Sequence, residues 1–339
     1  MSERRGSPRR MPRWWIAAAL AALAAWEGLP QQLLHTRDTQ WYVEAPTADW
    51  KRDGVRSVFV TANGIRVHLE TTAEEGAGEA AVAARQHVLI VPGTGTGAGM
   101  FRRWPSKDDS MVAELSKRKG VVVTAVDLRG HGRTTVTPGP YSVELLAEDV
   151  AGAMRSAFPG EKFHVYGLSV GMGVAMVLAL DHKDVVASIS GNGFLFDRSV
   201  FQFDAWFFSR PFVTRALGMQ LLATAAEMVL DINERGVFVE ESRHMPLEGF
   251  VQTSLSWLDF NVTHRMHEYE APMLLLSPDK DAKATGNSKA QFLRETAGCR
   301  AKVDIVEFAG FSHFMPFERG GPRRIVEAMV RSHGLGESA

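Results

Sequence analysis

The sequence has little cysteine and no excess of charge. Cys299 is the only cysteine among its 339 residues, so the chain cannot form an intramolecular disulfide and depends on its core for stability. The 38 Lys and Arg residues against 39 Asp and Glu residues give a formal net charge of −1, which gives no support for nucleic-acid binding. With 45% hydrophobic and 23% charged residues, the composition is typical of an ordinary globular protein.

The sequence also lacks the usual signatures of metal sites. Neither an HExxH nor a CxxC motif occurs, and His264 and His267 stand three residues apart without such a partner motif. We therefore expect no metal.

The N-terminal segment lacks an apolar run long enough to span a bilayer. Arginines precede a 13-residue apolar run, Trp14 to Trp26, which is about 20 Å long as a helix, against a hydrocarbon core of roughly 30 Å. This arrangement is typical of a signal peptide; a signal anchor, an organelle transit peptide and a tail without a targeting role are the alternatives. We expect residues 1–30 to direct export or membrane anchoring, with membrane association through residues 14–26, and residues 31–54 to form a linker.

What the sequence does contain is an alternation of strand and helix patterns. An alternating segment around Asn63-Gly64 predicts a β-hairpin. Continuous apolar runs predict buried parallel strands in HVLIVPG, VVVTAVDL, KFHVYGLS, VVASISGN, APMLLLSPDKD and AKVDIVEF. Helical patterns separate these runs, and Ser142 is the expected N-cap of one of them. The alternation predicts an α/β fold with a mostly parallel, twisted sheet and helices on both faces.

Residues 194–268 interrupt the alternation with aromatic-rich, helical patterns. Because sheet patterns resume afterwards, we interpret this segment as a helical cap inserted into one domain of about residues 55–335. Rings that would either line a pocket or only pack the cap are Phe194, Phe196, Phe201, Phe203, Trp206, Phe207, Phe208 and Phe212.

The segment GLSVG at residues 167–171 places a serine between a predicted strand and a predicted helix. A hydroxyl is a poor nucleophile without a neighbouring base. A G-x-S-x-G turn holds Ser169 on a sharp bend, and the helix that follows offers backbone N–H groups to an oxyanion. The alternative is a glycine-rich joint between strand and helix that carries no chemistry.

Candidate partners for this serine come later in the chain, at the ends of predicted strands. His313 lies in GFSHF after the last predicted strand, and Asp281 lies in LLLSPDKD after the strand before it. Asp279 competes for the acidic role. Each side chain alone suits a solvated loop, but three such positions at strand ends favour a catalytic triad.

These segments, with VPGTG at 91–95 and DLRGHGRT at 127–134, resemble the α/β-hydrolase superfamily, particularly its capped lipases, esterases and serine-aminopeptidase-like members. The resemblance covers about residues 55–335. It implies that Ser169 is the nucleophile, His313 the general base and Asp281, rather than Asp279, the acid that orients the histidine. Pro278 stands where the superfamily usually has glycine.

The resemblance also implies an oxyanion hole made by the backbone N–H groups of Thr94 and Val170. Pro92 replaces a histidine usual in the superfamily, which should not matter for a backbone donor. His131, in GHG, is expected to belong to a structural turn. No cofactor is implied, because the triad supplies nucleophile, base and charge stabilisation.

A serine at the elbow argues against the epoxide hydrolases and haloalkane dehalogenases of this fold, which attack through aspartate. We therefore expect a serine hydrolase that acts on small-molecule carboxylic esters with an apolar, even lipid-like, acyl group. A peptidase or amidase with the same triad and a non-catalytic binding protein on this fold are the alternatives. The sequence predicts no oligomeric state.

Overall fold

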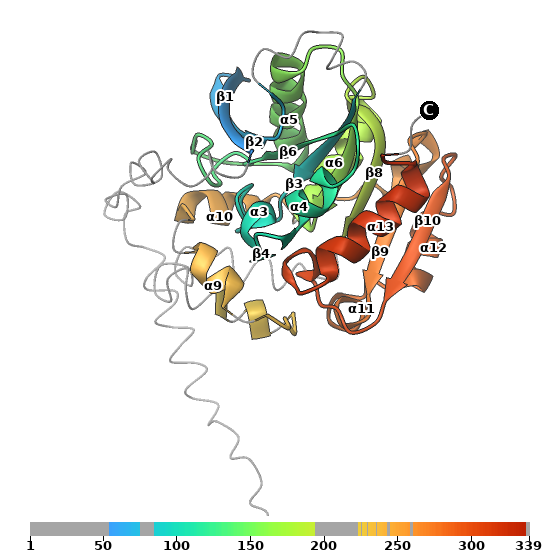
Figure 1. The fold of residues 1–339 in the computed structure, drawn as a ribbon. Helices are drawn as coiled ribbons and strands as arrows, with labels where there is room; N and C mark the ends of the chain where they lie inside the picture. Colours follow the sequence, from blue (N-terminus) through green and yellow to red (C-terminus); the bar gives the residue numbers. More distant parts are fainter. Residues whose placement is uncertain are drawn as a thin grey trace, which may run out of the picture. The chain divides into compact units, whose positions relative to one another are not determined.

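The computed structural model describes residues 54–74, 85–193, 223–224, 226–228, 230–234, 236–242, 245–257 and 260–336. All of these residues lie in one unit, residues 39–339 (Figure 1). The predicted targeting segment and the rings predicted at positions 194–212 lie outside the described residues. Within the described ranges, no helix is long and apolar enough to cross a membrane.

One sheet organises the described residues. Its strands follow the order β1-β2-β6-β3-β7-β8-β9-β10. The bounds are β1 (Arg56–Ala62), β2 (Ile65–Thr71), β3 (Gln86–Val91), β6 (Val121–Val126), β7 (Phe163–Leu168), β8 (Val186–Asn192), β9 (Met273–Pro278) and β10 (Val303–Phe308). The pairs β1–β2 and β2–β6 are antiparallel, and every other neighbouring pair is parallel. The α/β class with a mostly parallel sheet is confirmed.

Helices and two very short strands connect the sheet. They are α3 (Met100–Arg103), β4 (Pro105–Ser106), β5 (Asp109–Ser110), α4 (Met111–Ser116), α5 (Val143–Ala157), α6 (Val170–Asp181), α9 (Val237–Ser242), α10 (Leu247–Leu255), η4 (Thr263–Glu268), α11 (Asp279–Thr285), α12 (Lys289–Glu295), η5 (Met315–Phe317) and α13 (Gly321–His333). The Ser142 side chain caps α5 by accepting a hydrogen bond of 3.1 Å from the Leu145 N–H, as expected.

The predicted hairpin joins β1 to β2 through a tight turn. Asn63 and Gly64 both have positive φ, 46° and 74°, which matches the backbone twist of neighbouring antiparallel strands. Ala62 pairs with Ile65 directly across the turn. The hairpin extends the parallel sheet on its β6 side.

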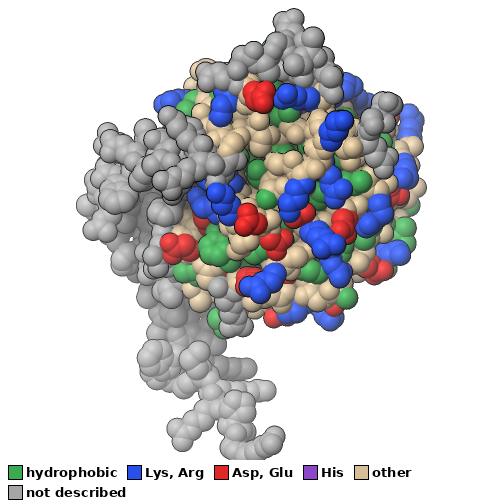
Figure 2. Space-filling view, viewed as in Figure 1, with side chains coloured by type: hydrophobic (Ala, Val, Ile, Leu, Met, Phe, Trp, Pro, Cys, Tyr) green, Lys and Arg blue, Asp and Glu red, His purple; other side chains and the backbone are tan. Residues whose placement is uncertain are grey.

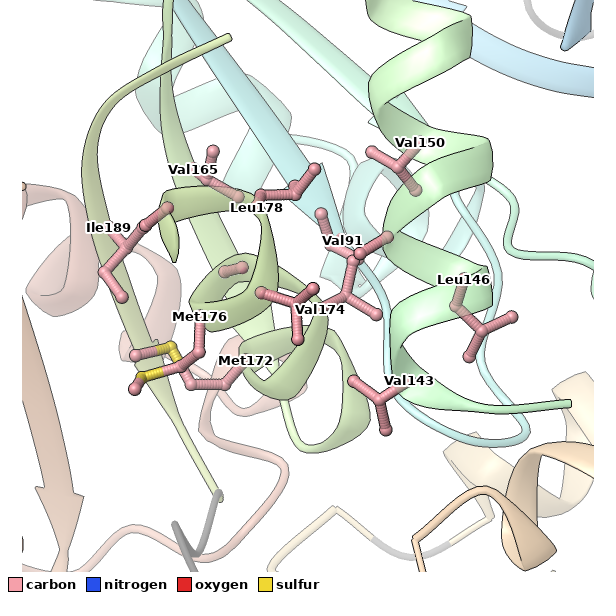
Figure 3. Packing of buried hydrophobic residues seen from close by; sticks show 14 of the residues in the cluster. Val91, Val143, Leu146, Val150, Val165, Met172, Val174, Met176, Leu178 and Ile189 are labelled. Atoms are coloured by element: carbon pink, nitrogen blue, oxygen red, sulfur yellow. The ribbon is translucent and has the colours of Figure 1, made fainter. Parts of the chain in front are cut away.

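Alternate residues of the strands serve two separate cores, one on each face of the sheet. Leu89 and Val91 of β3 pack with α5 and α6, as Figure 3 shows for that core. Val88 and Ile90 of the same strand pack in the second core, with residues of α3, α4 and α13. Because both faces are covered, the central strands read as continuous apolar runs rather than as alternating ones.

Helix α6 is buried along its length except at its last residue, Asp181. Every residue from Val170 to Leu180 is buried. The helix also approaches the sheet too closely for side chains at its crossing point. A Cβ added at Gly171 would lie 2.1 Å from the Val91 carbonyl oxygen, and one at Gly167 would lie 2.4 Å from the Gly171 oxygen. The glycines around the serine therefore allow strand and helix to come together.

Charged side chains of both signs are scattered over the visible face of the described part, among uncharged and hydrophobic ones (Figure 2). Figure 2 shows Lys and Arg interspersed with Asp and Glu on one face. Some form exposed pairs, such as Arg155 with Asp184 at 2.7 Å and Lys183 with Glu270 at 2.9 Å. Such exposed pairs contribute little to stability.

Candidate active site

Ser169 stands at the sharp turn between β7 and α6. Its backbone has φ 56° and ψ −119°, a conformation that residues with a side chain seldom adopt. The backbone N–H donates to the Asn192 carbonyl at 2.9 Å, which ties the turn to the end of β8. The serine is half-buried, whereas its neighbours Leu168 and Val170 are fully buried. This strained, open position suits a nucleophile.

His313 and Asp281 form a buried pair. The histidine follows β10, the aspartate lies in the first turn of α11 just after β9, and Nδ1 of the ring is 3.0 Å from Oδ1 of the carboxylate. The side chain of Asp281 is fully buried and that of His313 is 9% exposed. Because a carboxylate only accepts, Nδ1 carries a proton, and Nε2 is the ring nitrogen left to act as a base.

The end of β8 contacts both the turn that carries the serine and the loop that carries the histidine. Asn192, whose carbonyl holds the Ser169 N–H, also donates from Nδ2 to the His313 carbonyl at 2.9 Å. The imidazole lies directly over the next residue, since a Cβ added at Gly193 would be 2.3 Å from Cε1 of His313. Asn192 therefore connects the turn of Ser169 with the loop of His313 at the carboxyl edge of the sheet.

Asp279, the competing acid, contacts other groups. Its Oδ1 accepts a hydrogen bond of 2.7 Å from the Gly310 N–H, and Oδ2 is 3.8 Å from Nζ of Lys283. Its side chain is 42% exposed. Asp281, in contrast, is steadied by Asn287, whose Nδ2 donates to Oδ2 at 3.3 Å. The geometry therefore favours Asp281 as the residue that orients His313.

The two residues predicted to form the oxyanion hole belong to segments next to the serine. Val170 is the first residue of α6, a helix of 12 residues whose N-terminus presents backbone N–H groups. Thr94 lies in the loop after β3, residues 93–98, which we call the oxyanion loop after the role that the sequence predicts for it. This loop touches the serine, because a Cβ added at Gly93 would lie 3.1 Å from Cβ of Ser169.

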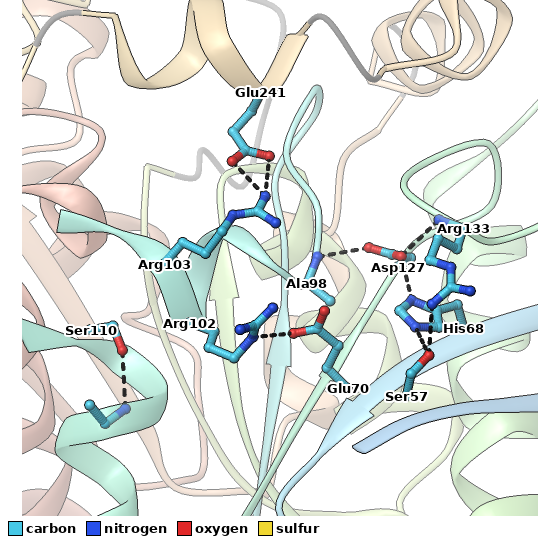
Figure 4. Close-up of polar contacts among 11 residues, drawn as sticks. Ser57, His68, Glu70, Ala98, Arg102, Arg103, Ser110, Asp127, Arg133 and Glu241 are labelled. Atoms are coloured by element: carbon cyan, nitrogen blue, oxygen red, sulfur yellow. Dashed lines mark hydrogen bonds and ion pairs between the residues drawn. The ribbon is translucent and has the colours of Figure 1, made fainter. Parts of the chain in front are cut away.

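A buried carboxylate, Asp127, holds the far end of the oxyanion loop (Figure 4). Its Oδ1 accepts from the Ala98 N–H at 2.7 Å, and its Oδ2 is 2.7 Å from Nδ1 of His68 and accepts from the Arg133 N–H at 2.9 Å. Burial acts to raise the pKa of Asp127, but the hydrogen bond and charge of His68 and the two backbone donors outweigh it, so the pKa lies below its usual value. The carboxylate therefore stays charged and anchors the loop.

A second buried carboxylate, Glu318, holds the loop that carries His313. It accepts hydrogen bonds from the Ser312 N–H and hydroxyl. It also accepts a hydrogen bond of 2.7 Å from Nδ2 of Asn233, in the segment that the sequence assigns to the cap. Glu318 is 2% exposed. The histidine loop is thus connected to the described part of residues 194–268.

Aromatic rings close over the oxyanion loop and the histidine. A Cβ added at Gly95 would lie 2.6 Å from the ring of Phe238, in α9. The ring of Phe238 is 5.3 Å from that of Phe314, which in turn meets the His313 ring edge-on at 5.5 Å. Phe250, in α10, lies 3.4 Å from the same Gly95 position. The described lining near the site is therefore apolar.

Helix α9 is fixed at both ends. Glu227 accepts from the Phe238 N–H at 2.9 Å and from the Gly236 N–H at 2.8 Å. Glu241 accepts from Arg103 of α3 (Figure 4), with both oxygens 2.6 Å from Nη2. Phe238 is therefore held in place over the site.

Sequence reasoning missed Asn192, Asp127 and Glu318. Asn192 is the last residue of β8 and Asp127 directly follows β6, so both lie at the carboxyl ends of strands, as Ser169 does. Because ligands of parallel sheets bind at this edge, polar residues at these positions could have been predicted to belong to the site. Glu318 had none, because it follows the histidine in an irregular segment. No group of three or more His, Cys, Asp or Glu side chains in the described ranges could hold a metal ion.

Comparisons with known proteins find the same fold. A family model described as alpha/beta hydrolase fold matches residues 86–223. A putative carbamate hydrolase, RutD, of Caulobacter segnis is 35% identical over 105 residues, which are 30% of this chain and 36% of that protein, so the chain spans about a third of the relative it matches. The enol-lactonase of Burkholderia xenovorans LB400 has a TM-score of 0.61 at 21% identity, covering 80% of this chain and 100% of that one. A thermophilic esterase of Thermogutta terrifontis has a TM-score of 0.63 at 21% identity, covering 81% and 97%.

Proposed function

On the premise that the chain has the α/β-hydrolase fold, we propose that it is a serine hydrolase that cleaves carboxylic esters through an acyl-enzyme on Ser169. The observation that carries the proposal is the buried contact of 3.0 Å between Nδ1 of His313 and Oδ1 of Asp281, beside a strained serine. A fold of this kind hosts many functions, so the proposal depends on these side chains and not on the fold.

In the acylation step, Oγ of Ser169 forms a bond to the carbonyl carbon of the ester while its proton moves to Nε2 of His313. Asp281 remains ionised and stabilises the imidazolium. The negative charge that develops on the carbonyl oxygen is bound by the N–H groups of Thr94 and Val170. The bond to the leaving oxygen then breaks, and His313 gives its proton to the departing alcohol.

In the deacylation step, water takes the place of the alcohol. It forms a bond to the acyl carbon as its proton moves to His313, and the bond to Oγ of Ser169 then breaks. The histidine returns the proton to the serine and the carboxylic acid leaves. Over the two steps, the ester and one water are consumed, and a carboxylic acid and an alcohol are released.

The apolar surroundings support an ester with an apolar acyl group. Phe238, Phe250 and Phe314 border the oxyanion loop and the histidine, so a hydrocarbon chain would be desolvated there at little cost. An ester of a medium or long chain fatty acid fits this lining better than a charged substrate.

An amide or carbamate substrate would use the same steps with a nitrogen leaving group. The matched segment of the carbamate hydrolase relative covers only part of either protein, so it favours this alternative weakly. Comparing rates on an ester and on the amide or carbamate of the same acyl group separates these substrates.

A fluorophosphonate probe tests the proposal most directly. It should label the wild-type chain, and peptide mass spectrometry should locate the label on Ser169. The Ser169→Ala variant should fold, remain unlabelled and lose ester turnover by at least about 1,000-fold. If the wild-type chain is not labelled, or if the variant still turns over esters, the proposed function is wrong; the former would indicate a non-catalytic binding protein.

A further inference from the structure

One backbone N–H of the oxyanion loop donates a hydrogen bond to the side chain of a histidine outside the loop. The Gly95 N–H donates to Nε2 of His131 at 3.2 Å. His131 belongs to the turn after β6, and its side chain is fully buried. The sequence had assigned this residue only to a structural turn.

The two contacts of His131 define its tautomer. Nδ1 is 3.1 Å from the Arg129 carbonyl, which can only accept, so Nδ1 carries a proton. Nε2 faces the Gly95 N–H, which can only donate, so Nε2 is unprotonated. His131 is therefore a neutral ring that is protonated on Nδ1. Burial is the main cause that lowers its pKa to about 4, while Arg129 and Asp127 act in the opposite direction, so the ring stays neutral at neutral pH.

The contact with Gly95 fixes one of the two peptide units that meet at Thr94. A trans peptide is planar, with C=O and N–H pointing in opposite directions. The unit before Thr94 is held by the Gly93 oxygen, which accepts from the Thr96 N–H at 3.1 Å and from Oγ1 of Thr96 at 2.8 Å. The Thr94 N–H therefore points away from Thr96. The unit after Thr94 contains the Gly95 N–H that His131 holds.

We propose that His131 is a positioning residue of the oxyanion hole: its Nε2 lone pair holds the peptide unit after Thr94, while the contacts of Thr96 hold the unit before it, so that Thr94 presents its N–H from between two anchored peptide units. The inference rests on the proposed function, since it concerns the same oxyanion hole. His131 touches neither substrate nor Ser169 in this role; it acts through Gly95.

Neither water nor the side chain that packs on Gly95 can replace Nε2 of His131 as the acceptor. Water has no access to the buried ring, and Phe238 covers Gly95, so closely that a Cβ there would lie 2.6 Å away. A Gly95 N–H without its partner would be a buried, unsatisfied donor. The loop would have to rotate to satisfy it, and that rotation moves the Thr94 N–H.

Two matched variants separate the two ring nitrogens. In His131→Asn the side-chain amide can replace Nδ1 as a donor to Arg129 but cannot reach Gly95. In His131→Gln the longer side chain can place its oxygen near the position of Nε2 and accept from Gly95. Each variant is assayed with p-nitrophenyl butyrate for kcat and KM, and its fold is checked by thermal unfolding.

We expect His131→Asn to lower kcat by roughly 10- to 100-fold with little change in KM, since an oxyanion donor acts mainly in the transition state. His131→Gln should restore kcat to within about threefold of the wild-type value. Equal losses in both variants, no loss in either, or a loss confined to KM would overturn the inference.

A measurement on the wild-type chain keeps the inference testable even if His131→Asn does not fold. Nitrogen-15 NMR of histidine-labelled protein at pH 7 should show a neutral ring protonated on Nδ1, assigned by its absence from the His131→Gln spectrum. A ring protonated on Nε2 would overturn the inference. Failure of fluorophosphonate labelling would instead overturn the proposed function, so the two failures are distinguishable.

Discussion

Asn192 donates a hydrogen bond of 2.9 Å from Nδ2 to the backbone carbonyl of His313, although 121 residues separate them in the chain. The oxygen of the same side chain accepts from Oη of Tyr166 at 2.6 Å. Burial raises the pKa of Tyr166 well above its usual value, so its hydroxyl remains a donor. The tyrosine therefore orients the asparagine, and the asparagine holds the histidine loop beside the serine.

Loss of this contact should slow catalysis. Asn192→Leu removes both hydrogen bonds in a buried position, and we expect kcat to fall by roughly 10- to 100-fold because His313 is misplaced relative to Ser169. Tyr166→Phe is the matched control, since it keeps the contact from Asn192 to His313, and its loss should be about threefold or less. Steady-state kinetics on a nitrophenyl ester measures both. Equal losses in the two variants would contradict the role given to Asn192.

The two neighbouring aspartates should differ sharply in their importance. Asp281→Asn leaves the shape of the site but removes the charge that orients His313, so kcat should fall by about 1,000- to 10,000-fold. Asp279→Asn, two residues away, should reduce kcat by less than about tenfold, since its contacts are with Gly310 and Lys283. The reverse ranking would transfer the acidic role to Asp279.

Phe238 should limit the length of the acyl chain. Its ring fills the space between Gly95 and Phe314, so Phe238→Ala should admit longer or branched chains. We expect kcat/KM for nitrophenyl decanoate relative to butyrate to rise about tenfold, the effect of one or two methylene contacts. Phe158→Ala, which removes a ring packed against Phe163 and His87, serves as a control that leaves the preference unchanged. An unchanged preference in Phe238→Ala would show that the ring does not border the acyl chain.

Stability should depend on pH through His131. The unfolded side chain binds a proton near pH 6.5 and the folded one only near pH 4, so protonation favours the unfolded state as the pH falls from about 6.5 to about 4. The free energy of unfolding should therefore be about 2 kcal/mol lower at pH 5 than at pH 7 because of His131. In His131→Gln this difference should disappear, and urea unfolding at both pH values measures the free energy of unfolding in each protein. Identical pH dependence in His131→Gln and wild type would contradict the buried neutral ring.

A second histidine should contribute to the remaining pH dependence. The pKa of His333 is also lowered to about 4, mainly by burial and then by the charge of His164.

We propose that residues 1–30 direct the chain to a membrane or through it. The arginines before Trp14 and the short apolar run support this proposal. A reporter fused to residues 1–35 should be found in the membrane fraction or in an exported compartment, whereas replacing Leu20 and Leu23 by Asp should leave it in the soluble fraction. A reporter that is soluble and cytosolic with the native segment would refute the proposal.

The strands were predictable because they are buried on both faces and therefore read as uninterrupted apolar runs. The Asn63-Gly64 turn and the Ser142 cap carry local chemical signals, and the structure confirms them. The end of α4 carries a weaker local signal: Gly120 is the residue that suits a helix stop, but the helix ends at Ser116. Helix α11 was missed, because Pro278 and the acidic residues that follow it suit a turn as well as a seven-residue helix.

The candidate site was predictable where its residues follow strand ends, and it was not where contacts cross between distant segments. Ser169, Asp281 and His313 each follow a recognisable strand, and their catalytic roles stay predictions. The acceptor role of His131 depends on the position of Gly95, 36 residues earlier, and no local pattern reveals such a contact. Glu318 is unremarkable in the sequence and gains its importance only from the burial that folding imposes on it.

The burial of α6 from Val170 to Leu180 has a consequence for protein engineering. A stretch of helix without a solvent-facing side cannot shift to accommodate a larger residue, so volume added there would be transmitted to the turn at Ser169. Libraries for new substrate preferences should therefore keep that stretch constant and diversify positions 238 and 250, which the proposed function places beside the acyl chain, rather than position 314, whose ring packs against His313.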